Sequence, residues 1–166
     1  CSNVKNVTEG EDNFNYSVEQ FADLQLLRYK VPGFEELELK QKELIYYLTQ
    51  AALEGRDILF DQNGKYNLII RKMLEEVYTN YSGDKNDTNY KNLEVYLKRV
   101  WFSNGIHHHY SADKFLPAFS QEFFRGELAK LDQSKLPLQE GETLDQLCNE
   151  VFPVMFDPNV MAKRVN

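Results

Sequence analysis

Three consecutive histidines lie in residues 100–115, VWFSNGIHHHYSADKF, where side chains able to do chemistry are most concentrated. Ser103, Asn104 and Gly105 follow an apolar helical pattern, so the histidines come directly after a helix end. Backbone groups there have no helical partners. Tyr110 adds an aromatic ring directly after the histidines. This combination indicates a place where a ligand is held.

The three histidines, His107, His108 and His109, are a poor metal site by themselves. Consecutive side chains diverge in a helix and in a strand, so three neighbours cannot coordinate one ion with good geometry. In an extended segment His107 and His109 share a face, but a metal would still need a third ligand from elsewhere. We therefore predict no metal site here and favour two other interpretations, a ligand-binding role or a structural, exposed cluster.

Catalytic motifs are missing from the sequence, which has no HExxH, no paired-cysteine metal motif and no nucleophile elbow. The acidic residues at 35–38 and 75–76 fit solvated helix faces better than a paired-carboxylate site. Arg56, Asp57 and Asp61 lie beside a predicted helix end, and we interpret them as a buried structural network. The residues alone therefore indicate a helical binding or scaffolding module.

Composition excludes some partners. A net charge of −7 argues against a protein that binds nucleic-acid phosphates. No apolar stretch approaches the roughly 20 residues that a membrane span needs. Ten tyrosines and eleven phenylalanines in 166 residues indicate that some aromatic side chains line a groove or face a partner.

The two cysteines, Cys1 and Cys148, cannot form a disulfide framework. Cys148 lies on an apolar helical face and is predicted to be a small buried side chain. A chain that begins Cys-Ser-Asn with a polar tether, residues 1–16, is similar to a bacterial lipoprotein after signal-peptide removal. This predicts a lipid on Cys1, a disordered tether and a lipid-anchored protein of the bacterial cell envelope. The alternatives are an arbitrary chain boundary and a cytoplasmic protein.

We expect residues 17–166 to form a single, mainly α-helical subdomain. Residues 18–31 fit a helix or a strand, and we favour a short extended segment near residues 20–30 that pairs with something outside this chain. Helical spacing begins near Leu39 and ends at Gly55. A turn is expected over residues 61–67.

Apolar side chains at helical spacing predict the remaining helices. One runs from about residue 66 to 81. The next begins at a cap formed by Asp87 or Thr88, and the histidines follow its end. Ser120 is expected to cap a further helix, and Thr143 with Gln146 matches a capping box before the last one. Pro153 is expected to end or kink that helix.

Two segments resemble the N-terminal part of bacterial dipeptidyl peptidase III, a zinc exopeptidase that releases dipeptides from peptide N-termini. They are FADLQLLRYKVPGFEELELKQKELIYYLTQAALEGRDILFDQN and VWFSNGIHHHYSADKFLP. The resemblance runs from about residue 14 to the end. It implies part of one lobe of a two-lobed peptidase with a wide cleft. The family's zinc ligands and catalytic glutamate belong to HExxGH and EExxAE-type motifs, which this sequence lacks, so no catalytic residue can be assigned.

The resemblance also implies a role for residues 103–111, which would border the subsites for the substrate's N-terminal residues. Tyr110, Asn104 and Gly105 are the positions implied to face the cleft, and His107 to His109 are added from their chemistry. Tyr110 would supply an aromatic wall, while Asn104 and carbonyls near Gly105 would accept hydrogen bonds from a peptide ammonium. An imidazole could donate to a peptide carbonyl.

The expected function is therefore a substrate-cleft wall of a zinc dipeptidyl peptidase, inactive by itself. Its partners would be a peptide and the zinc lobe of its own polypeptide. The alternatives are a non-catalytic, lipid-anchored helical binding module and the product of a truncated gene.

Overall fold

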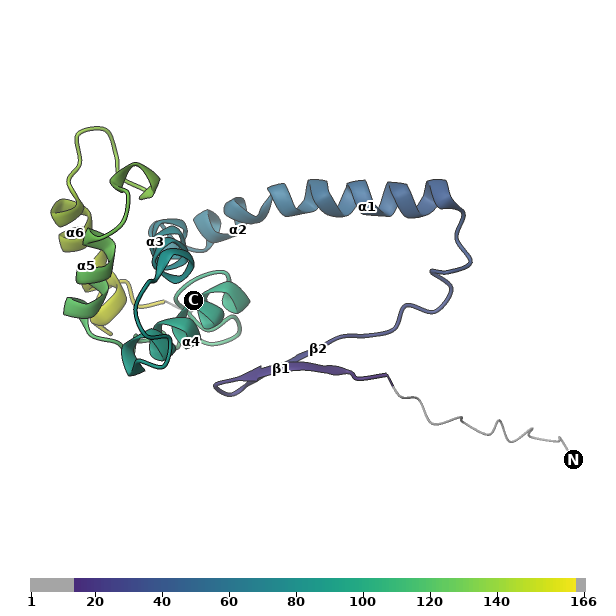
Figure 1. Cartoon of the computed structure of the whole chain (residues 1–166), viewed down its shortest axis with the longest axis horizontal. Helices are drawn as coiled ribbons and strands as arrows, with labels where there is room; N and C mark the ends of the chain where they lie inside the picture. Colours follow the sequence, from purple (N-terminus) through teal and green to yellow (C-terminus); the bar gives the residue numbers. More distant parts are fainter. Residues whose placement is uncertain (1–13, 164–166) are drawn as a thin grey trace, which may run out of the picture. The chain divides into compact units, whose positions relative to one another are not determined.

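The computed structural model describes residues 14–163 (Figure 1). They form a mainly α-helical protein with one two-stranded antiparallel hairpin. The chain divides into two compact units, residues 1–42 and residues 43–166, which we describe separately. Cys1 and most of the predicted tether lie outside the described residues. No helix between residues 14 and 163 is long and apolar enough to cross a membrane.

The first unit contains strands β1 (Ser17–Phe21) and β2 (Leu24–Leu27), which pair with each other in antiparallel register. The predicted extended conformation is confirmed, and the two strands pair with each other. A partner outside the chain stays a prediction. The two strands are joined by a tight turn in which Ala22 has φ 50°. Alanine seldom adopts this conformation. The hairpin could not be recognised from the sequence, because its turn lacks the Asn-Gly or Asp-Gly pair that usually marks one.

Helix α1 (Leu39–Glu54) is followed by α2 (Arg56–Asn63), with only Gly55 between them (Figure 1). The predicted start and end of α1 are confirmed. The predicted turn over residues 61–67 is wrong in its first half, because α2 continues to Asn63. Helix α1 is described over its full length and buries no side chain, so its apolar stripe stays exposed.

The core of the second unit lies between four helices: α3 (Asn67–Asn80), α4 (Thr88–Ser103), α5 (Gln121–Ala129) and α6 (Leu144–Phe156). A short 3₁₀ helix, η1 (Gln133–Lys135), precedes α6. Helix α3 packs against α2, α4 and α5, and α5 packs against α6. The predicted apolar faces supply the core, including Ile70, Met73, Leu74, Val77, Leu93, Leu97, Val100, Phe124, Leu128, Leu147, Cys148 and Val151.

The predicted caps are confirmed at three helix starts. Asp87 accepts hydrogen bonds from the backbone N–H groups of Asn89 and Tyr90, and Ser120 accepts one from Phe123. Thr143 begins α6 with a complete capping box. Of the two expectations for Pro153, that it ends α6 is wrong, because the helix continues to Phe156, and the kink stays a prediction. Pro153 has no N–H, so the hydrogen bond that this group would donate within the helix is absent.

Candidate functional site

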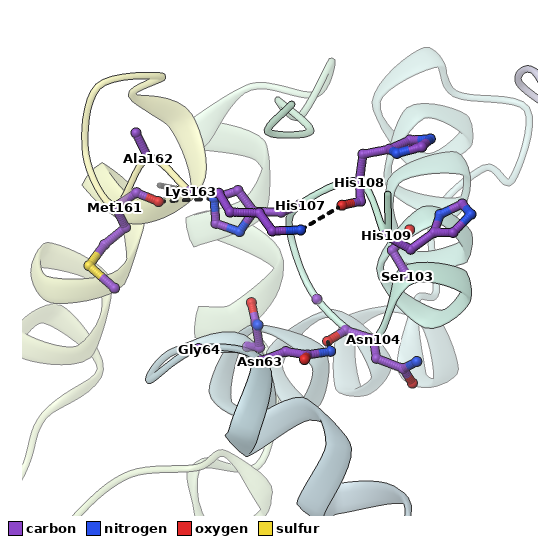
Figure 2. A pocket seen from close by; sticks show the side chains of 12 residues that line it. Asn63, Gly64, Ser103, Asn104, His107, His108, His109, Met161, Ala162 and Lys163 are labelled. Atoms are coloured by element: carbon purple, nitrogen blue, oxygen red, sulfur yellow. Dashed lines mark hydrogen bonds between the residues drawn. The ribbon is translucent and has the colours of Figure 1, made fainter. Parts of the chain in front are cut away.

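A cavity of about 340 Å³ lies in the second unit, where the α2–α3 turn meets the end of α4 (Figure 2). We call it the asparagine–histidine cavity. Its lining comes from three stretches of the chain that are far apart in sequence. The lining residues are Asn63, Gly64, Asn67, Ser103, Asn104, Gly105, His107, His108, His109, Met161, Ala162 and Lys163.

Asn104 and Gly105 turn the chain sharply at the end of α4. Asn104 adopts the left-handed conformation, with φ 53° and ψ 38°. The Asn104 N–H donates to the carbonyl of Trp101, and the Gly105 N–H donates to that of Val100 over 3.0 Å. This pair of bonds is the Schellman arrangement, which satisfies carbonyls left open at a helix end. It brings both predicted residues to the cavity wall.

Asn67, the first residue of α3, forms part of the buried lining and is only 3% exposed. Its Oδ1 accepts a hydrogen bond from the Ile106 N–H over 3.2 Å. Asn63 contributes a second amide, whose Nδ2 donates to the Asn104 carbonyl over 3.2 Å (Figure 2). The sequence analysis missed both asparagines, because no local pattern links residues 63–67 with residues 104–106.

The histidines belong to a short hairpin, residues 106–115, that we call the histidine loop. His107 and Lys114 form an antiparallel bridge. The His108 N–H donates to the Asp113 carbonyl over 2.7 Å, and the Phe115 N–H donates to the Ile106 carbonyl over 2.8 Å. These bonds hold the loop in a defined shape directly after α4.

The His107 imidazole points away from the other two (Figure 2). His107 Nε2 lies 2.9 Å from the Met161 carbonyl and must carry a proton to donate to it (Figure 2). His108 Nδ1 accepts from the backbone N–H groups of Tyr110 and Ser111 over 3.2 and 3.1 Å. In the neutral ring, His108 Nε2 therefore carries the proton. The His109 ring stacks on His108 with 4.5 Å between centroids.

Tyr110 lies outside the cavity. Its side chain is 91% exposed, and its ring lies over His109 with 4.2 Å between centroids. The structure therefore brings Asn104, Gly105 and the three histidines to one cavity but does not place Tyr110 in its lining.

Residues 157–163 close one side of the cavity, and we call them the C-terminal strap. Lys114 Nζ donates to the carbonyls of Asp157 and Val160 over 2.6 and 2.7 Å. In the opposite direction, Lys163 Nζ donates to the carbonyls of His108 and Ser111, each over 3.2 Å (Figure 2). Side chains on both segments thus tie the strap to the histidine loop. Nothing in the sequence of residues 157–163 indicated this role.

The lining carries positive charge. Lys163 is its one fully charged side chain, and neither Asp nor Glu is present among the lining residues described. Burial lowers the pKa of His107, and the positive charges of Lys114 and Lys163 lower it further, against the opposing hydrogen bond to Met161. Burial also lowers the pKa of Lys114.

The cavity does not fit a zinc ion. Between residues 14 and 163 there is no group of three or more His, Cys, Asp or Glu side chains placed to hold a metal. At this site His107 Nε2 faces the Met161 carbonyl, and His108 Nδ1 accepts from two backbone N–H groups, so neither nitrogen is available to a metal.

A second, larger cavity of about 810 Å³ shares Asn104 with the first. Its wall contains an ion pair between Arg71 and Asp57 at 2.6 Å and a hydrogen bond from Trp101 Nε1 to Glu75 at 2.7 Å. The Arg71 guanidinium lowers the pKa of Asp57. The polar network predicted beside the helix end at Gly55 thus uses Asp57, but its partner is Arg71 of α3. It is also half-exposed rather than buried, since 48% of the Asp57 side chain is accessible.

Comparison of the chain with models of known protein families and with curated proteins finds no match.

Proposed function

We propose that this chain forms a substrate-cleft wall of a dipeptidyl peptidase III-like zinc exopeptidase. One observation carries the proposal. The segment whose sequence resembles that family, from Ser103 to His109, contributes six of its residues to one cavity. The resemblance rests on the two sequence segments quoted above. The mainly helical fold agrees with that assignment at a coarse level.

The chemistry of the cavity suits a peptide. Amide side chains donate and accept hydrogen bonds as peptide groups do, and Asn63, Asn67 and Asn104 lie together in the lining. Its volume of about 340 Å³ is at the lower end of the range for ligand sites, roughly 300 to 1,000 Å³. A short stretch of peptide fits this space better than a folded partner.

In this proposal the zinc and its glutamate base belong to another part of a longer polypeptide. The residues described here do not fit zinc, so their role is to bind and orient the substrate. The parent reading frame tests this directly. An HExxGH motif within a few hundred residues is expected, and its absence would remove the peptidase from consideration. The 166-residue chain alone should release no dipeptide from an arginyl-arginyl chromogenic substrate, with or without added zinc.

Peptide binding can be measured on this chain through the fluorescence of Trp101, its only tryptophan. Trp101 lines the second cavity beside Asn104, close to the proposed site. Short peptides should shift its emission saturably. Asn104→Gly should weaken binding about tenfold, because it removes the side-chain amide while glycine retains the left-handed backbone. An unchanged dissociation constant would take Asn104 out of the peptide site.

A non-catalytic, lipid-anchored binding module is the second candidate. One observation favours it, since every wall of the cavity comes from residues 63–163 and no other lobe is needed to form it. Peptide binding by a chain whose reading frame lacks HExxGH would support this candidate. The lipid on Cys1 remains a prediction, and mass spectrometry of the amino-terminal peptide from the native cell envelope tests it.

A further inference from the structure

We infer that the asparagine–histidine cavity binds the carboxylate of a peptide and not its ammonium group. This inference rests on the proposed function, because it takes the ligand to be a peptide. It changes the expectation drawn from the sequence, in which Asn104 and nearby carbonyls accept hydrogen bonds from a peptide ammonium.

The carbonyl groups around the cavity already accept hydrogen bonds from the chain itself. Lys163 donates to the carbonyls of His108 and Ser111, and His107 donates to that of Met161. Asn63 donates to the Asn104 carbonyl. An incoming ammonium would have to compete with an ammonium that the protein already holds there. The carbonyls of His108, Ser111, Met161 and Asn104 therefore each already hold a donor from the chain.

Three side chains of the lining offer donors to a ligand. The Lys163 ammonium has three N–H groups, and its two described hydrogen bonds go to neutral carbonyls, which leave its charge uncompensated. Asn67 uses Oδ1 to accept from Ile106, so its NH₂ group is the part left to bind a ligand. Ser103 lines the cavity with a buried hydroxyl that has no partner among the residues described.

Charge in the surroundings favours the same ligand. The described lining contains Lys163 and three histidines but no carboxylate, although the whole chain has a net charge of −7. Burial lowers the pKa of His107 most, and the positive charges of Lys114 and Lys163 lower it further. A carboxylate would accept charge-assisted hydrogen bonds from Lys163.

The test compares short peptides that differ in the sign and position of their charge. Acetyl-Ala-Ala with a free carboxylate, its carboxamide and Ala-Ala-amide with a free ammonium are titrated into the chain, with Trp101 fluorescence as the readout. Acetyl-Glu-Ala-amide tests whether a side-chain carboxylate serves as well as a terminal one. The free acid should bind about tenfold more tightly than its carboxamide, the difference expected for one hydrogen bond to a charged group. This preference should shrink as salt is added.

Lys163→Gln should remove most of the preference for the acid. Lys91→Gln is the matched control, because it deletes one exposed lysine about 20 Å along α4 from Asn104. The inference would be overturned if the unmodified chain bound the acid and the carboxamide equally, or bound the free-ammonium peptide more tightly. Either result would still support a peptide site. Failure of all four peptides to bind would instead count against the proposed function itself.

Discussion

The side-chain amide of Asn67 occupies the space that a side chain at Gly105 would need. A Cβ atom added to Gly105 would overlap the Asn67 amide nitrogen and lie 2.7 Å from its Cγ. Gly105 also has φ 154°, a conformation that residues with a side chain rarely adopt. This close approach joins the start of α3 to the end of α4 and forms one wall of the cavity.

Gly105→Ala should therefore destabilise the protein by about 2–4 kcal/mol, from the steric overlap and the backbone strain together. Urea unfolding monitored by circular dichroism measures the change in the free energy of unfolding. Gly126→Ala is the matched control, because Gly126 lies inside α5 with open space where a Cβ would go. That variant should be more stable by about 0.5–1 kcal/mol, since alanine favours helix. Similar destabilisation by both changes would contradict this account.

The Asp87 cap should contribute measurably to stability. Its Oδ1 accepts from the N–H groups of Asn89 and Tyr90 at 2.8 and 3.2 Å, at the start of the helix that carries the histidine loop. Asp87→Ala should cost about 1 kcal/mol in urea unfolding. Asp87→Asn should cost much less, because an asparagine oxygen can accept the same bonds. Equal losses in the two variants would show that the negative charge, and not the hydrogen bond, is what matters.

Acid should weaken the fold through His107. The folded protein lowers the pKa of this imidazole, mainly through burial, so the unfolded chain binds a proton more readily. The contribution of His107 to the free energy of unfolding is fully present above the pKa of the imidazole in the unfolded chain, about 6.5. It is lost as the pH falls from there through the lower pKa of the folded protein. Unfolding free energies measured from about pH 8 to about pH 5 should show this loss.

His107→Gln provides the control for that pH dependence. A glutamine amide can still donate to the Met161 carbonyl, but it does not titrate. The variant should lose less stability than the unmodified chain between neutral and mildly acidic pH. If the free energy of unfolding fell equally in the two proteins, the pH dependence would come from other groups.

Lys114 should hold the C-terminal strap against the histidine loop. Lys114→Met keeps most of the aliphatic stem but removes the donors to the Asp157 and Val160 carbonyls. Amide hydrogen exchange in residues 157–163 should become faster, whereas exchange in α3 should not change. Lys91→Gln, which removes an exposed lysine at the far end of α4, should leave strap exchange as it is. Unchanged exchange in Lys114→Met would show that other contacts hold the strap.

Local chemistry determined most of the helical organisation. Polar caps at Asp87, Ser120 and Thr143 and apolar spacing over α3, α4 and α5 act within a few residues, so they could be interpreted from the sequence. Predictions failed where a local rule was overridden. The β1–β2 turn uses Ala22 in a conformation that alanine seldom adopts, and α6 continues past Pro153 because little helix remains beyond it.

The sequence by itself determined that the histidines follow a helix end, because this depends on neighbouring residues. The stacking of His109 on His108 was not expected, since consecutive side chains usually diverge. Only the tertiary structure decided what surrounds the histidines. It placed Asn63 against Asn104 and Asn67 against Gly105, tied the C-terminal strap to the histidine loop through Lys163, and left Tyr110 in solvent. These contacts join residues about 40 to 55 positions apart. No local pattern encodes such pairings, since they form only when the helices pack and bring distant polar groups together.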